Sequence, residues 1–135
     1  MKAKIPLKIV GINLILFGLL FGLISFNKEF LRPLSSPNSL SAIFTGSFPN
    51  FIAAYLISLA PINAVIVRRP VRSQTIVYLS AVIIFLVLAI EEVKPMWGAS
   101  THFDIYDIVA SALGSALAIL TYELIRNAKL FKFNT

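Results

Sequence analysis

Four long apolar stretches, separated by shorter polar segments, dominate the pattern of the chain. They cover residues 9–26, 48–67, 75–90 and 105–125. An α-helix rises about 1.5 Å per residue and the hydrocarbon core of a bilayer is about 30 Å thick, so the first, second and fourth stretches can cross a membrane. The third is shorter, but Arg72 and Glu91 flank it and extend it into the headgroup zones. The pattern predicts an all-α integral membrane protein, a single domain over residues 1–135 folded as a four-helix bundle.

The basic residues are distributed unequally between the two sides of this predicted bundle. Nine of the twelve lie in the two tails and in the segment between the second and third spans, whereas Lys28, Arg32 and Lys94 lie in the other connections. Because short loops rich in Lys and Arg remain in the cytoplasm, we expect both termini of this multi-pass cell-membrane protein to be cytoplasmic. The same bias accounts for the net charge of +6. We therefore expect membrane lipids, and not nucleic acid, as partners.

Two further expectations concern the connections and the ends of the first two spans. No A-x-A-like cleavage site follows the first span, which favours an uncleaved helix over a signal peptide. Residues 27–47, with Pro33, Pro37 and several serines, predict an irregular external loop. Ser47 is then expected to cap the second span, with Pro49 in its first turn and Asn50 either capping or contacting a headgroup.

Small residues recur at intervals of four in the first and last spans. Gly18 and Gly22 form one such pair, and Ala110, Gly114 and Ala118 form a longer ridge. Small side chains let two membrane helices approach closely. We expect the ridges to pack inside the bundle, although a homo-oligomer or hetero-oligomer formed through them is the alternative.

Most of the carboxylates gather at the second external connection, between the third and fourth spans. Acids that lie close together repel one another, which raises some of their pKa values. Such a cluster favours proton exchange, the binding of a hard cation through oxygen ligands, or the binding of a cationic headgroup. Asp104 also has an ordinary role as a helix cap, whereas Asp107 lies one turn inside the span, where an ionisable group is expensive. The predicted ligand-binding residues are Glu91, Asp104, Asp107, Asn50, Ser111 and His102.

The sequence assigns no catalytic residue, cofactor or metal site. The chain has no cysteine and a single histidine, which argues against an ordinary zinc site. It also lacks a Gly-x-Ser-x-Gly elbow, a Walker loop and a His-Glu-x-x-His motif.

The same segment resembles the VanZ-like membrane proteins. The resemblance lies in Glu91-Glu92-Val93-Lys94, in the run from Thr101-His102-Phe103-Asp104 through Asp107 and Ser111 to Gly114, and in Ser47-Phe48-Pro49-Asn50-Phe51. The chain departs from the family pattern where Lys94 replaces a Gln and Ser111 replaces an Asn. The resemblance implies four spans and a role in the cell envelope associated with glycopeptide antibiotic resistance, without a defined reaction.

Three functions fit these patterns. The leading hypothesis is a non-enzymatic envelope protein whose external carboxylates bind a lipid, a lipid-linked wall precursor or an amphipathic antibiotic such as a glycopeptide. The second is an outer-leaflet enzyme on a lipid-linked substrate, with Asp107 as base and His102 as acid. The third is a scaffold that joins a larger membrane complex through its small-residue ridges.

Overall fold

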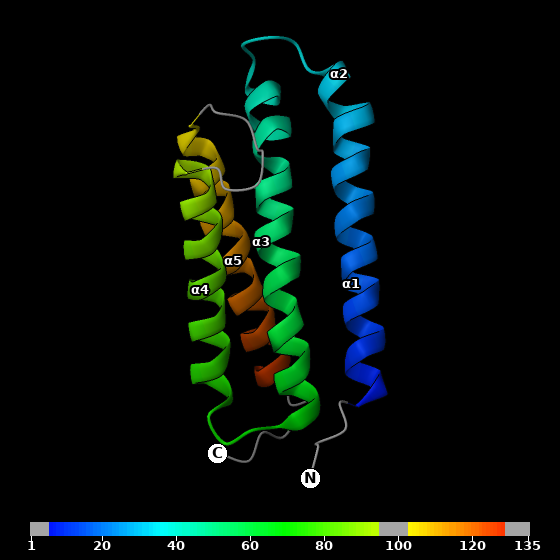
Figure 1. The fold of residues 1–135 in the computed structure, drawn as a ribbon, viewed down its shortest axis with the longest axis vertical. Coiled ribbons are helices and arrows are strands. Elements are labelled where there is room, and N and C mark those ends of the chain that lie inside the picture. Colours follow the sequence, from blue (N-terminus) through cyan, green and yellow to red (C-terminus); the bar gives the residue numbers. More distant parts are fainter. Residues whose placement is uncertain (1–5, 95–102, 129–135) are drawn as a thin grey trace.

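Four long helices run side by side along the length of the molecule (Figure 1). The computed structural model describes residues 6–94 and 103–128. The helices are α1 (Leu7–Phe26), α3 (Leu40–Arg68), α4 (Ser73–Val93) and α5 (Ile105–Asn127), and a π-helical segment η1 (Asn27–Leu31) and a short α2 (Arg32–Leu34) prolong α1. With α1 counted through Leu34, the helices have 28, 29, 21 and 23 residues, and each is long and apolar enough to cross a bilayer. The prediction of an all-α, multi-pass membrane protein is confirmed at this level.

The helix α3 lies at the centre of the arrangement. It contacts α1, α4 and α5, whereas α1 contacts neither α4 nor α5 among the described residues. The predicted four-helix bundle is therefore a three-helix unit of α3, α4 and α5, with α1 laid against the outer side of α3 (Figure 1). The start of α1, the end of α5 and the turn between α3 and α4 all lie at one end of the molecule.

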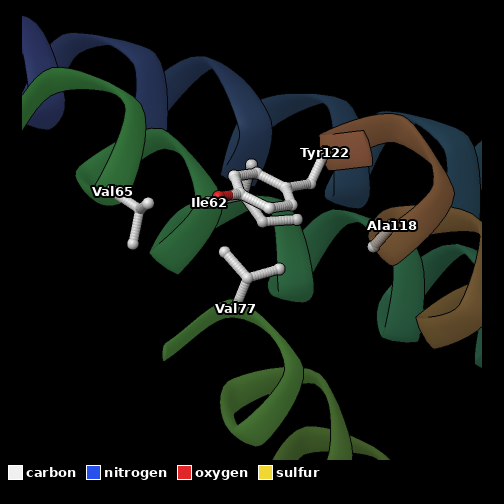
Figure 2. Packing of buried hydrophobic residues seen from close by; sticks show 5 residues of the cluster. All are labelled: Ile62, Val65, Val77, Ala118 and Tyr122. Carbon is white, nitrogen blue, oxygen red and sulfur yellow. The ribbon is translucent and has the colours of Figure 1, made fainter. Parts of the chain in front are cut away.

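The packed core lies toward the turn between α3 and α4. Figure 2 shows Ile62 and Val65 from α3, Val77 from α4, and Ala118 and Tyr122 from α5 converging there. Elsewhere many large aliphatic and aromatic side chains are exposed along α1 and α4. Helices that are apolar on nearly every face are typical of lipid surroundings, which accounts for this exposure.

Close packing of α3 against α5 depends on Gly114. A Cβ atom placed there would overlap the carbonyl oxygen of Phe51 and would lie 2.9 Å from the Cβ of Ala54 and 3.0 Å from the backbone nitrogen of Tyr55. Ala110, Ser111 and Ala118 on the same face are also buried. The predicted small-residue ridge of the last span is thus an internal packing surface.

The glycine pair of α1 behaves differently. A Cβ atom at Gly18 or Gly22 would have nothing within 4 Å. The expectation that these glycines pack inside the bundle is wrong, because among the described residues no neighbouring helix lies close to either of them.

The segment predicted as an irregular loop over residues 27–47 is mostly helical. The first helix continues through Leu34, and α3 begins at Leu40, where the Oγ of Ser39 accepts a 3.3 Å hydrogen bond from the backbone nitrogen of Ala42. Ser47 and Pro49 therefore lie inside α3, and the capping roles expected for Ser47 and Asn50 are wrong. The hydroxyl of Thr45 bonds back to the carbonyl of Ser41 at 2.9 Å, which is how a polar run is accommodated in a helix.

Pro49 interrupts the backbone hydrogen bonds of α3, and the preceding helical segment compensates. A proline has no N–H, so the carbonyl of Thr45, four residues earlier, loses its usual donor. The fully buried Asn27 donates its Nδ2 to this carbonyl at 2.7 Å. Arg32 donates its Nη2 to the neighbouring carbonyl of Gly46 at 3.3 Å. The end of the first helix is thereby fastened to the start of α3.

A second polar contact joins α1 to α3 near the other end of the molecule. The buried Asn63 donates its Nδ2 to the carbonyl of Ile9 at 3.2 Å and to the Oδ1 of Asn13 at 3.0 Å. The Asn27 and Asn63 contacts lie far apart along α1 and fix its register against α3.

Candidate functional site

A cavity of about 410 Å³ opens beside the starts of α3 and α5, at the end of the molecule opposite the turn between α3 and α4. Segments far apart in the sequence meet there: α2, the first turns of α3, and the start of α5. Three of the side chains that line it are ionisable, one basic and two acidic. The lining residues are Arg32, Ser35, Ala42, Thr45, Gly46, Asp104 and Asp107.

Asp104 combines a structural role with a place on the cavity wall. It is the N-cap of α5, and its Oδ1 accepts a 2.9 Å hydrogen bond from the backbone nitrogen of Tyr106. Its own backbone N–H donates to the Oε1 of Glu92 at 3.1 Å, which ties the end of α4 to the start of α5. The capping role predicted for Asp104 is confirmed, and capping still leaves this exposed residue on the cavity wall.

Asp107 lies one turn farther into α5 and is half-buried. The side chains of Asn50 and Ser47 are its polar neighbours, Arg32 attracts its charge, and Asp104 repels it. Its Oδ1 is buried and has no hydrogen-bond partner among the described residues. Because Asp107 also lines the cavity, its carboxylate is available to accept a hydrogen bond from a donor group of a ligand.

Three of the predicted site residues that the structure describes, Glu91, Ser111 and Asn50, do not line the cavity. Glu91 lies half-buried in the last turn of α4, and Ser111 is buried one turn beyond Asp107 on α5. Neither is among the residues of the cavity wall. His102 falls outside the described residues. Of the predicted set, the structure brings together Asp104, Asp107 and Asn50.

The predicted set of ligand-binding residues leaves out the basic member of the site, Arg32, although the sequence offers Arg32 and Lys28 of the first external connection as possible partners of the acids. The sequence pattern places Arg32 in an irregular loop, but the structure places it on the same cavity wall as the two aspartates. Its Nε and Nη2 donate hydrogen bonds to the carbonyls of Thr45 and Gly46 at 3.5 and 3.3 Å. A signal for it exists in the sequence. Pro49 inside a helix frees the carbonyl four residues earlier, and a donor from another segment is then required.

The cavity can hold groups of both signs. A guanidinium group binds phosphate or carboxylate, and carboxylates accept hydrogen bonds from an amine. A ligand with a phosphate and an amine a few bonds apart would match this arrangement. Among residues 6–94 and 103–128, no three acidic or histidine side chains are grouped to hold a metal ion.

A second polar cluster, also missed, lies at the opposite end of the α4–α5 pair. The Oε1 of Glu123 accepts hydrogen bonds from the hydroxyl of Tyr78 at 2.5 Å and from the Nε2 of Gln74 at 3.2 Å. Its Oε2 pairs with Arg126 at 2.6 Å. These contacts fasten α4 to α5, so we interpret the Glu123 cluster as structural.

Comparison with known proteins adds no family and no function to this description of the site. No family model, no curated protein and no solved structure matches the chain.

Proposed function

We propose that the protein is an integral membrane protein of the bacterial cell envelope that binds the polar headgroup of an amphiphile in the cavity between α2, α3 and α5. The observation that carries the proposal is the convergence of Arg32, Asp104 and Asp107 on one cavity. Charged side chains near a lipid phase are expensive, and their gathering around an open space is better explained by a ligand than by packing alone.

The length of α3 supports a headgroup ligand. Its 29 residues span about 44 Å at the usual rise, whereas the hydrocarbon core is about 30 Å thick. The first turns of α3 would then extend into the headgroup region, with Thr45 and Gly46 on the cavity wall. A bilayer lipid, a lipid-linked wall precursor and an amphipathic antibiotic all carry polar groups at that depth.

The proposed orientation puts the cavity on the extracytoplasmic side. The end of α3 and the turn after it carry Arg68, Arg69 and Arg72, and the start of α1 and the end of α5, at the same end of the molecule, carry Lys8 and Arg126. In the sequence, four more basic residues precede α1 or follow α5. This bias supports cytoplasmic termini. The resemblance to the VanZ-like proteins supports a role in the envelope, with glycopeptide resistance as the phenotype to examine.

Headgroup selectivity tests the proposal. The protein would be reconstituted into phosphatidylglycerol nanodiscs that contain either phosphatidylethanolamine or phosphatidylcholine, and the lipids retained after mild detergent extraction would be identified by native mass spectrometry. A primary ammonium can donate hydrogen bonds to Asp107, and a quaternary ammonium cannot. We expect ethanolamine lipid to be retained about tenfold better, in line with the 1.5–3 kcal/mol typical of a charged hydrogen bond.

Matched variants separate the site from general charge effects. Asp107→Leu removes the acceptor and should abolish the preference, and Arg32→Gln should weaken retention of both lipids because it removes the phosphate contact. Glu29→Gln and Lys28→Gln remove exposed charges from η1 and should have no effect. If the native protein shows no headgroup preference, or if Asp107→Leu keeps it, the proposal is wrong and the scaffold interpretation is favoured.

A further inference from the structure

An apolar groove lies beside the polar cavity, on another face of the α3–α5 pair. It has a volume of about 380 Å³ and aromatic residues from both helices in its wall. The groove and the cavity share no lining residue. The residues that line the groove are Ile43, Phe44, Ser47, Phe48, Phe51, Tyr106, Val109, Ala110 and Leu113.

The close contact at Gly114 sets the inner limit of the groove. Among the lining residues, Leu113 and Phe51 lie farthest from the starts of α5 and α3. Next to them, Gly114 packs directly on the backbone of Phe51 and Tyr55. From that contact the groove extends toward the starts of the two helices, as far as Ile43 and Tyr106. Along α5 this is about 10 Å at the usual rise, the length of part of an extended hydrocarbon chain.

A buried serine belongs to this largely apolar wall. Ser47 lines the groove and is only 8% exposed, yet its Oγ has no hydrogen-bond partner among the described residues. It is also a polar neighbour of Asp107, although the two do not reach hydrogen-bond geometry. A buried hydroxyl without a partner costs about 1–3 kcal/mol, so an acceptor from outside the chain would stabilise it.

We infer that the groove holds one ester-linked acyl chain of a glycerolipid, and that the Ser47 hydroxyl donates a hydrogen bond to the ester carbonyl of that chain. The inference rests on the proposed function, which places an amphiphile headgroup at the cavity. The ester of a glycerolipid lies between its headgroup and its hydrocarbon tail, and Ser47 lies between Asp107 and the apolar groove. The aromatic wall and the position in a membrane-spanning pair favour an acyl chain over a protein segment as the occupant.

The experiment uses diester and diether forms of phosphatidylethanolamine as probes. Nanodiscs of phosphatidylglycerol would contain one form or the other, and retained lipid would be measured by native mass spectrometry. The native protein should retain the diester about fivefold better, the ratio that corresponds to one neutral hydrogen bond. Ser47→Ala should lose this ratio. Ser58→Ala, which removes another buried hydroxyl without a partner from α3 but lies outside the groove, should keep it.

Filling the groove supplies a second measurement. Val109→Trp adds bulk at a half-exposed position of the groove wall, and it should lower retention of both probes about tenfold. Leu120→Trp, at a similarly exposed position of α5 outside the groove, should not. Size-exclusion chromatography would establish that both variants remain folded and monodisperse.

The outcomes are distinguishable from those of the headgroup test. Equal retention by Val109→Trp and Leu120→Trp would overturn the groove as a lipid site, and an absent ester preference in the native protein would overturn the role of Ser47. An ester preference that depends on Ser47, without any preference for ethanolamine over choline, would support the groove and refute the proposed headgroup function.

Discussion

Gly114→Ala is the smallest substitution that tests the packing of α3 on α5. The added methyl group would overlap the carbonyl oxygen of Phe51 and crowd the backbone nitrogen of Tyr55, at 3.0 Å. Both are backbone atoms and cannot rotate away, so the helices must separate. Overpacking of this kind typically costs about 1–3 kcal/mol. The exchange of glycine for alanine in a helix returns up to about 1 kcal/mol. We expect a net loss of about 1–2 kcal/mol in the free energy of unfolding.

The same substitution at Gly22 is the matched control. A Cβ atom there meets nothing within 4 Å, so only the gain in helix propensity of up to about 1 kcal/mol applies. This gain is common to both variants, so they should differ by the overpacking cost alone, about 1–3 kcal/mol. SDS-induced unfolding in mixed micelles, followed by circular dichroism and tryptophan fluorescence, measures the difference. Equal stability of Gly114→Ala and Gly22→Ala would refute the close approach of α3 and α5.

Three further predictions concern orientation and the polar contacts between helices. Single cysteines at Ser36 and Val71, in a chain with no native cysteine, should react with an impermeant thiol reagent in intact cells at position 36 only; labelling of position 71 alone would reverse the orientation. Asn63→Ala should destabilise the protein by about 0.6–2 kcal/mol because α1 loses a buried contact, and an unchanged unfolding curve would argue against that contact. Glu123→Gln should cost less than about 1 kcal/mol, since the glutamine still accepts from Tyr78 and loses only a partly exposed ion pair; a larger loss than in Asn63→Ala would contradict this.

The sequence predicts the last span well because apolar residues and a capping acid define it together. The stretch expected over residues 105–125 is α5 (Ile105–Asn127), and its buried small face and exposed aliphatic face both match the pattern. The second span is predicted eight residues too short at its start. The composition around Ser41 and Thr45 suggests a loop, but both hydroxyls find hydrogen-bond partners within the helix and its cap. The Thr45 hydroxyl donates to the carbonyl of Ser41, and the Ser41 hydroxyl bonds with that of Ser39.

The candidate site is predictable only in part, for a related reason. Asp104 and Asp107 share one stripe of one helix, so their proximity follows from helical periodicity. The position of Arg32 depends on the first helix continuing through Leu34 and docking on α3, which is a tertiary arrangement. Glu91 was grouped with the aspartates by closeness in sequence, but the cavity wall includes Asp104 and Asp107 and not Glu91.

The pairing of Asn27 with the carbonyl freed by Pro49 has a consequence for biogenesis. The donor, Asn27, is fully buried, and a carbonyl left without a donor at such a contact is costly, so α3 cannot satisfy its own backbone there without the preceding helix. Because Asn27 precedes Thr45 in the chain, the donor is synthesised before the acceptor that needs it. The first two spans are thus suited to enter the membrane as one helical hairpin, with the hydrogen bond closing as α3 arrives beside α1.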